Sequence, residues 1–577
     1  MSMNTYSKVL GGFALIAIFV LAGGLVTAGA QSQVPTHPQV ATNPELTPFG
    51  DRPLLPEEDC PTCTSDTGCT SIQVSKMASD DGSVMTAHSC DGNYRTWLNI
   101  EPAETHPEGT MRDIKWGLLH TETLWDERRL RLKGQIPEAP ETYAYFNVAY
   151  PAMNEKGLSI GETTIGGRRE LYNDEGLFLI ENLQAITLER TTTARDAIKL
   201  IGELVAEYGY GDYGECLTFA DANEVWQLEI MGGGPIEAGA VWAAARIPDG
   251  QVGVSANIPR ISTLDLDDPD HYMASDNVHS LAEEMGWWDP DSGKPFRWWE
   301  AYSGSKPFST REFFILSTLA PDLNLSLDME ELPFSVVPDH KVSVREVMSY
   351  YRQTYEGTEF DMSKNLMVEQ RSSGRRGGGT NGNGDAPPDM VASPAVNNWT
   401  LRGDMGNLLN TLKPGTVDSM RTIAISACSY SQVIQNRGWL PPEIGTVAWF
   451  SFDNPGQSPR IPIFAGTTEL PPSFEIGGQH RFRTDSALWW FRRTNRLAMI
   501  KWGATRGKLE GAVQDFEDRA FTELPAIEKV AMEIYESGDY EAFRRYITQY
   551  SNDFALAAMA KWWEIGDEYW AVFARGW

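Results

Sequence analysis

The alternation of apolar and polar residues predicts a β-hairpin early in the chain. Residues 70–75 alternate, a polar turn follows at Asp81-Gly82, and a second apolar run ends at His88 and Asp91. Two such runs around a tight turn are typical of paired antiparallel strands. Because antiparallel partners face each other across one ladder spacing, the hairpin brings Cys69, at the start of its first strand, close to His88 and Asp91.

Helical periodicity appears further along. Amphipathic helices are predicted at 181–190 and 193–208, with Thr193 as the N-cap of the second. Strands are predicted at 142–150, 158–160, 216–220, 225–230, 241–247, 252–261, 420–427 and 445–452. Strands, two helices and more strands, without β-α-β alternation, are typical of a layered α+β fold.

The second half of the chain has three distinct parts. Residues 265–340 are loop-rich and aromatic, as in an inserted lobe or a lid, and a helix is predicted at 344–355. Residues 372–388 are rich in Gly, Asn and Arg and predict a flexible surface loop. From Ser486 to the end the pattern is helical. We therefore expect residues 69–500 to form the main domain and residues 501–577 to form a helical segment.

The first 68 residues predict export and processing. Residues 1–30 combine Lys8, a long apolar run and Ala28-Gly29-Ala30, which is typical of a cleaved signal peptide. An uncleaved membrane anchor stays open as an alternative, because the apolar run is near spanning length. Residues 31–68 are rich in Pro, Thr and Asn and predict a linker or propeptide. Either way, most of the protein is expected outside the cytoplasm.

Charge and motifs exclude several classes of function. A net charge of −31 argues against nucleic acid and anionic membranes as partners. The chain has no glycine-rich phosphate loop, no H-E-x-x-H and no G-x-S-x-G. The chain therefore lacks the sequence motifs that usually indicate nucleotide binding, a zinc metalloprotease or a serine hydrolase.

The cysteines are too sparse for a disulfide scaffold. The six are Cys60, Cys63, Cys69, Cys90, Cys216 and Cys428. Four fall between 60 and 90, but they lack the paired C-x-x-C spacing of a zinc site. A Cys60–Cys63 disulfide stays open, and Cys90, Cys216 and Cys428 are expected to be buried.

Motifs in a fixed order carry a family resemblance. They are the block from Gly68 to Asn93, Met153-Asn154-Glu155-Lys156-Gly157-Leu158, Tyr355-Glu356-Gly357-Thr358 with Phe360-Asp361-Met362, and Val447-Ala448-Trp449-Phe450 with Pro455. Together they resemble the PepD-type dipeptidase family, which includes the secernins. Its members are cysteine N-terminal-nucleophile (Ntn) hydrolases, distantly related to penicillin V acylase and bile salt hydrolase.

The resemblance implies a four-layer αββα fold with a C-terminal helical extension, and it implies that processing between Gly68 and Cys69 exposes the nucleophile. The chemistry of the residues agrees. A thiol attacks as the thiolate, and a free α-amine, with a pKa of about 7.7–8, is a base matched to neutral pH. Glycine before the bond leaves its carbonyl open to attack by the Cys69 thiol.

Further roles are implied position by position. Asp91 matches the carboxylate that orients the N-terminal amine, and Asn257 matches the amide that donates to the oxyanion. A backbone N–H near Thr163 is the second expected donor. His88 stands where many relatives carry Arg, so weaker thiolate stabilisation or pH-sensitive activity is expected.

Two residues are expected to contact the substrate, namely Asn154 within its motif and Arg421. Taken from the residues alone, every candidate also has an ordinary structural interpretation. Cys69 fits a buried thiol, His88 a strand-end histidine, Asp91 a turn residue, and Asn257 and Thr163 strand residues.

The expected function is that of an exported cysteine dipeptidase that acts on dipeptides or short peptides through a thioester, without metal or cofactor. Its expected partner is the peptide substrate, with no nucleic acid and no membrane once the signal is cleaved; a homo-oligomer stays open. Two alternatives remain. One is an N-acyl amide hydrolase with the same nucleophile, and the other is a catalytically silent exported interaction protein.

Overall fold

The computed structural model describes residues 68–234, 239–369, 390–393 and 395–574. The predicted signal peptide, the propeptide up to residue 67 with Cys60 and Cys63, and the loop 372–388 lie outside the described residues. The described residues belong to one compact unit, Thr64–Trp577. Within them, every helix is too short or too polar to cross a bilayer.

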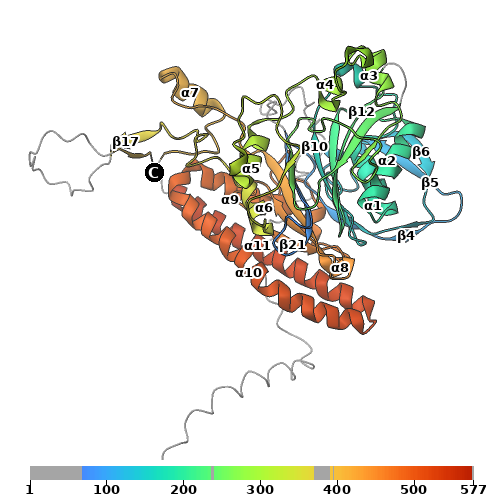
Figure 1. Ribbon diagram of the computed structural model, residues 1–577. Coiled ribbons are helices and arrows are strands. Elements are labelled where there is room, and N and C mark those ends of the chain that lie inside the picture. The colour runs from blue at the N-terminus through green and yellow to red at the C-terminus, as the bar shows by residue number, and fades with distance from the viewer. Residues whose placement is uncertain (1–67, 235–238, 370–389, 394, 575–577) are drawn as a thin grey trace, which may run out of the picture. The chain divides into compact units, whose positions relative to one another are not determined.

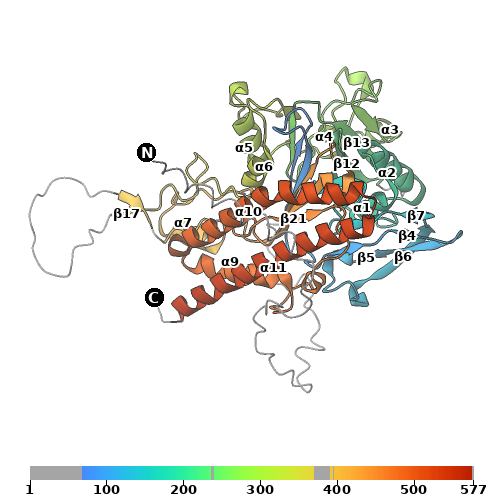
Figure 2. The same cartoon turned by 90° about the horizontal axis from the view of Figure 1, so that it is seen from below.

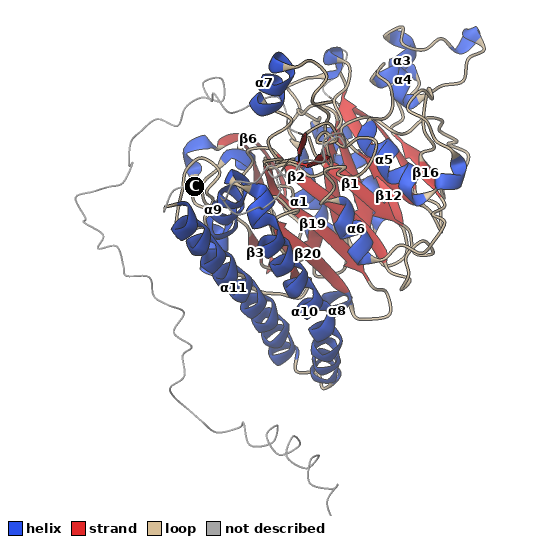
Figure 3. Cartoon of the chain, turned by 90° about the vertical axis from the view of Figure 1, so that its left-hand side faces the viewer, coloured by secondary structure: helices blue, strands red, loops and turns tan. Residues whose placement is uncertain are grey.

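The predicted hairpin is confirmed and forms the middle of a seven-stranded sheet. Strands β1 (Thr70–Val74) and β2 (Val84–Asp91) pair antiparallel, with Thr70 opposite Ser89. The strand order is β16-β14-β1-β2-β19-β20-β21. The other bounds are β14 (Val252–Ser255), β16 (Ser335–Val336), β19 (Cys428–Asn436), β20 (Thr446–Phe452) and β21 (Ile461–Phe464). In Figure 3, β1, β2, β19 and β20 lie side by side.

A second sheet of eight strands has the order β15-β13-β12-β11-β10-β9-β8-β3. Its bounds are β3 (Asn99–Glu101), β8 (Tyr145–Asn147), β9 (Met153–Asn154), β10 (Ser159–Thr164), β11 (Glu215–Ala220), β12 (Val225–Gly232), β13 (Ala240–Arg246) and β15 (Tyr272–Ala274). Strands β10, β11 and β12 contact β1 or β2, so the two sheets pack face to face. Polar contacts cross between them, as where Thr86 Oγ1 lies 2.6 Å from Thr218 Oγ1.

Helices cover the second sheet on its outer side. Helices α1 (Ile180–Arg190) and α2 (Ala194–Tyr208) contact strands of this sheet (Figure 1). The predicted cap is confirmed, because the Thr193 side chain accepts from the backbone N–H of Asp196. Every residue of β1 and β2 is buried, as expected of strands covered on both faces.

The first sheet is covered by helices from the second half of the chain. Helix α5 (Thr310–Leu319) contacts β14, and α6 (Val344–Tyr350) contacts β19. Near β20 and β21 lie α9 (Ala487–Ile500), α10 (Trp502–Glu536) and α11 (Tyr540–Phe573), with α10 and α11 side by side (Figures 1 and 2). The predicted helical C-terminal segment is thus present, and the mixed content confirms the α+β class.

The remaining elements are short. They are β4 (Glu104–Thr105), β5 (Met111–Trp116), β6 (Arg131–Pro137), β7 (Glu141–Thr142), β17 (Met367–Glu369), β18 (Met390–Ala392), α3 (Ser280–Glu284), α4 (Trp298–Tyr302), α7 (Asp404–Leu412) and α8 (Pro442–Gly445). The aromatic stretch 265–340 supplies α3, α4 and a separate small core that includes Trp298 and Tyr302.

Four predicted elements differ from the structure. The strand predicted at 142–150 is broken into the end of β7 and the short β8, which ends at Asn147. The strand predicted at 420–427 is wrong, because these residues form a loop whose Thr422 hydroxyl donates to the Ala424 carbonyl at 2.6 Å. The helix predicted at 344–355 ends at Tyr350. The strand predicted at 252–261 ends at Ser255, because the backbone turns into the left-handed region at Asn257, with φ 67°.

Candidate active site

Cys69 lies immediately before β1, between the two sheets, and is buried. The thiol of Cys90 on β2 and then burial raise the pKa of the Cys69 thiol well above its ordinary value. The backbone N–H of Asp91 acts in the opposite direction, because it donates to the sulfur and so lowers the pKa. In the unprocessed chain, Cys69 is therefore a neutral thiol at neutral pH.

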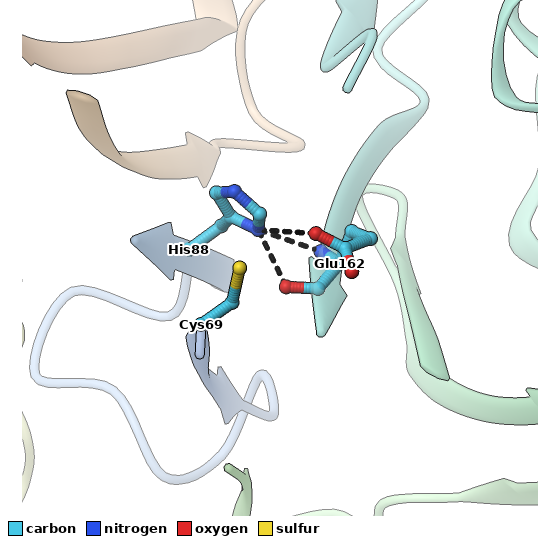
Figure 4. A group of neighbouring side chains, drawn as sticks. All are labelled: Cys69, His88 and Glu162. Carbon is cyan, nitrogen blue, oxygen red and sulfur yellow. Dashed lines mark hydrogen bonds and ion pairs between the residues drawn. The ribbon is translucent and has the colours of Figure 1, made fainter. Parts of the chain in front are cut away.

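Hairpin pairing brings the side chain of His88 to Cys69, as predicted. Their sulfur and ring nitrogen lie within 4.8 Å of each other and of a Glu162 carboxylate oxygen (Figure 4). The Nδ1 atom of His88 lies 2.9 Å from the backbone N and 2.6 Å from the backbone O of Glu162. Burial lowers the pKa of His88 to about 3, so this ring is neutral at physiological pH and supplies no positive charge to the thiol.

The positive charge beside the nucleophile comes from other segments. Arg421, from the loop before β19, forms an ion pair with Asp91 at 2.5 Å and also donates to the carbonyl of Gly68. Asp91 is buried at the end of β2, and it also accepts from the Ser89 hydroxyl at 3.2 Å. Arg421 thus lies at the bond between Gly68 and Cys69, and its contact with a substrate stays a prediction.

Arg311 is a second buried guanidinium at the same place. It extends from α5 and donates to the Cys69 carbonyl at 2.7 Å, to Thr70 Oγ1 at 3.0 Å and to Asn257 Oδ1 at 2.7 Å. It also lies 3.4 Å from the Gly68 carbonyl oxygen. Two arginines therefore surround the peptide bond before Cys69.

Asn257 packs directly against Gly68. A Cβ atom at Gly68 would lie 2.4 Å from Asn257 Oδ1, so only glycine fits there without a shift. The Asn257 amide donates to the Thr164 carbonyl at 2.7 Å. Thr163 is buried on β10, with its hydroxyl 2.9 Å from Ser255 Oγ. The structure therefore brings Asn257 to the segment that carries the nucleophile, with one of its two amide N–H groups donated to Thr164.

Asn154 requires a correction. Its Nδ2 donates to the carbonyls of Leu188 and Thr191, and its Oδ1 accepts from the backbone N–H groups of Lys156 and Leu158. These bonds use the full hydrogen-bonding capacity of the side chain. The Asn154 side chain therefore links its own turn to the C-terminal end of α1, and none of its donors or acceptors is available to bind a substrate.

Sequence reasoning missed Arg311, Cys90 and Glu162 as parts of this site. The Ser309 and Glu312 capping box at the start of α5 signals a helix start, but nothing local shows that the residue between them reaches Cys69. Glu162 lies in an alternating strand whose inward face becomes known only when the two sheets pack.

One group of metal-ligand types occurs among the described residues, namely Cys69, His88 and Glu162. These are residues that bind zinc elsewhere. However, His88 Nδ1 is already within hydrogen-bonding distance of the Glu162 backbone N and O atoms, so this ring nitrogen is not available as a metal ligand.

Three known proteins that are similar to this chain are named as dipeptidases. A probable dipeptidase of Salmonella dublin is 26% identical over 71% of this chain and 83% of its own length. A probable dipeptidase of Latilactobacillus sakei is 23% identical over 70% and 76%, and dipeptidase A of Lactobacillus helveticus is 22% identical over 80% and 87%.

An α+β fold with a buried thiol, a carboxylate and two arginines at one strand end, together with these relatives, defines the class of the protein as a peptidase. The profile of Peptidase family C69 matches residues 68–515, which is most of the chain. The chain belongs to this family. The match begins at Gly68, one residue before the candidate nucleophile.

Proposed function

We propose that this protein is a cysteine dipeptidase of the Ntn-hydrolase type, with Cys69 as nucleophile and as first residue of the mature enzyme. The observation that carries the proposal is the convergence of Asp91, Arg311 and Arg421 on Cys69 and on the peptide bond before it. The two facing sheets with helices on both sides support the Ntn type. The names of the relatives support dipeptides as substrates.

The arginines suggest how the precursor is processed. Arg421 donates to the Gly68 carbonyl oxygen and Arg311 lies near it, so both stabilise negative charge on that atom. The Cys69 thiol adds to the Gly68 carbonyl carbon, the C–N bond breaks and the amide nitrogen takes up a proton. Water then hydrolyses the resulting thioester, which leaves a free carboxylate on Gly68 and a free α-amine on Cys69.

The same groups then serve the substrate. The Cys69 amine, with a pKa of about 7.7–8, takes the thiol proton, and the thiolate attacks the scissile carbonyl. Departure of Gly68 removes one acceptor from each of Arg421 and Arg311, so the donors that faced the Gly68 carbonyl can turn to the new oxyanion. The second N–H of the Asn257 amide, which is not used by the bond to Thr164, and a backbone N–H near Thr163 are the further donors. The product amine leaves, and water hydrolyses the thioester.

We also propose that the protein is exported, on the basis of residues 1–30. Fractionation of producing cells locates the mature protein outside the cytoplasm if this is right. Accumulation of the mature form in the cytoplasm would contradict it.

The mature N-terminus and the variant Cys69→Ser test the mechanism together. Intact-mass and N-terminal sequencing are expected to place the mature start at Cys69, and Cys69→Ser is expected to lose turnover of a dipeptide panel. A panel of N-acyl amino acids separates the dipeptidase from the acylase alternative. A fully active enzyme that starts well before Cys69 would refute the mechanism, and no turnover on either panel would favour a silent interaction protein.

A further inference from the structure

Glu162 presents a buried carboxyl to the nucleophile without a cation beside it. It lies on β10 and is 0% exposed. One of its carboxylate oxygens lies within 4.8 Å of the Cys69 sulfur (Figure 4). Among the described residues, its Oε2 atom has no hydrogen-bond partner. Its Oε1 atom accepts from the Thr164 hydroxyl at 3.4 Å. A buried carboxyl with one oxygen left without a partner is costly, so its place beside a nucleophile calls for a functional reason.

The neighbours of Glu162 cannot neutralise it. The histidine 3.8 Å away, His88, is neutral at physiological pH because burial lowers its pKa to about 3. The two site arginines donate to backbone carbonyls, to Asn257 and to Asp91. Burial, and then the nearby Cys69, raise the pKa of Glu162 well above its usual value. Glu162 is thus held as a protonated acid, which a cation placed beside it would ionise.

The covalent geometry of a dipeptide supplies such a cation. The scissile carbonyl carbon and the α-amino nitrogen of the first residue are separated by two bonds, through one Cα. When the thiolate stands about 3–3.5 Å from the carbonyl carbon, the ammonium lies within reach of a carboxylate that is itself close to the sulfur. An N-acylated substrate has no charge at this position.

We propose that Glu162 binds the α-ammonium group of the substrate and so makes the enzyme specific for peptides with a free N-terminus. This inference rests on the proposed function, because it takes Cys69 as the attacking group. Two further acids on the same side favour a cation there. Glu215 is buried and Asp212 is half-buried, and burial raises the pKa of each above its ordinary value.

The test uses Glu162→Gln, which keeps the shape of the side chain and removes its charge. We expect kcat/KM for unblocked Ala-Ala to fall about 100-fold, since losing a charge-paired contact to a substrate group is worth a factor of this order. Hydrolysis of N-acetyl-Ala-Ala is expected to stay within about 3-fold of its wild-type value. Glu162→Asp, which withdraws the charge by one methylene, is expected to recover part of the loss.

A binding measurement keeps the inference testable without turnover. Calorimetric titration with a reduced-amide analogue of Ala-Ala is expected to show tight binding by the wild type and weak binding by Glu162→Gln. The N-acetyl form of the analogue is expected to bind both proteins equally weakly. The matched control is Glu181→Gln, the same change at a buried carboxyl on α1, which is expected to leave both measurements unchanged.

The outcomes separate this inference from the proposed function. If Glu162→Gln binds the amine analogue like the wild type, or loses both forms equally, the role of Glu162 is refuted while Cys69 catalysis stands. If wild type prefers neither form, the inference fails as well. If Cys69→Ser is fully active, the proposed function itself fails.

Discussion

At the scale of residues, the candidate site is a set of charges arranged around one peptide bond. Arg311 and Arg421 contact the Gly68–Cys69 segment, and Asp91 pairs with Arg421. His88, at a position where the family resemblance leads one to expect arginine, is neutral because it is buried. The positive charge expected from that position of β2 is supplied here by residues distant in sequence.

Gly68→Ala is expected to slow the appearance of the mature N-terminus. The new Cβ would lie 2.4 Å from Asn257 Oδ1, so the Asn257 side chain or the Gly68 backbone must shift, which disturbs the contacts of the arginines with both. Intact-mass spectrometry at successive times after expression measures the unprocessed fraction. Gly507→Ala is the control, because a Cβ there meets nothing within 4 Å. Equal processing rates for both variants would contradict the role of the close packing.

His88 is expected to make stability depend on pH. Its pKa is about 3 in the folded chain against 6.5 ordinarily, so between these values only the unfolded chain takes up the proton. The unfolding free energy therefore falls as the pH drops below about 6.5, by about 1.4 kcal/mol per unit from this residue. Urea unfolding of wild type and His88→Asn is expected to show the wild-type advantage shrinking by about 2 kcal/mol from about pH 7 to about pH 5.

The control for this prediction has the opposite sign. Asp339 and then Glu346 raise the pKa of His340, so its contribution is fully present at low pH and is lost as the pH rises through the raised pKa. Replacing His340 by Asn is expected to cost stability mainly at low pH. A wild-type advantage over His88→Asn that does not change with pH would refute the assignment of a buried, neutral ring.

At the scale of elements, packing of strands and helices decides which side chains meet. The hairpin β1–β2 places His88 near Cys69, whereas Glu162 arrives from the facing sheet and Arg311 from α5. The long helices α10 and α11 contact each other near β21, away from this convergence. Their contribution is to cover the first sheet.

Trp562→Ala in α11 is expected to destabilise the fold by about 3–5 kcal/mol, because it empties a large buried site. Trp562 is 0% exposed, packs near Phe491 and Phe516, and donates to the Gln457 carbonyl at 3.0 Å. Urea unfolding measures the loss. Trp570 on the same helix is 62% exposed, so Trp570→Ala is expected to change the stability little. Equal effects of the two variants would show that α11 does not pack as described.

At the scale of the whole molecule, the chain is acidic and buries several carboxyl groups whose pKa values are raised. The chain carries a net charge of −31, and several of its carboxyls lie in the interior of the fold. Burial raises the pKa of Glu229 to about 7 and of Glu181 to about 8. Burial likewise raises the pKa values of Glu162, Glu215 and Asp212.

The protein is therefore expected to lose stability as the pH rises from about 5 to about 8. The folded chain keeps protons on these carboxyls, whereas the unfolded chain releases them above the ordinary pKa values of 3.8 for Asp and 4.5 for Glu. Rising pH therefore stabilises the unfolded state relative to the folded state. The carboxyls outnumber His88, which acts in the other direction. Urea midpoints across this range measure the slope, and Glu181→Gln with Glu229→Gln is expected to flatten it. Glu541→Gln, at a side chain 91% exposed, is the control; a midpoint that rises with pH would contradict the prediction.

Local pattern was sufficient for features that depend on neighbours in sequence. The alternation around Asp81-Gly82 predicted the β1–β2 hairpin and the approach of His88 to Cys69, and helical periodicity predicted α1, α2 and the C-terminal helices. Local pattern was insufficient where a contact overrides propensity. The apolar run at 420–427 reads as a strand, yet it is a loop that carries Arg421 to Asp91.

The sequence by itself determined the class of fold, the nucleophile candidate and the family resemblance, because strand alternation, a glycine before a cysteine and ordered motifs are all local signals. Only the tertiary structure showed which charged side chains surround Cys69. Arg311, Arg421 and Glu162 are separated from Cys69 by roughly 90 to 350 residues, so their convergence depends on how the sheets and helices pack. It also reassigned Asn154, whose hydrogen-bonding capacity is consumed by its own turn and α1.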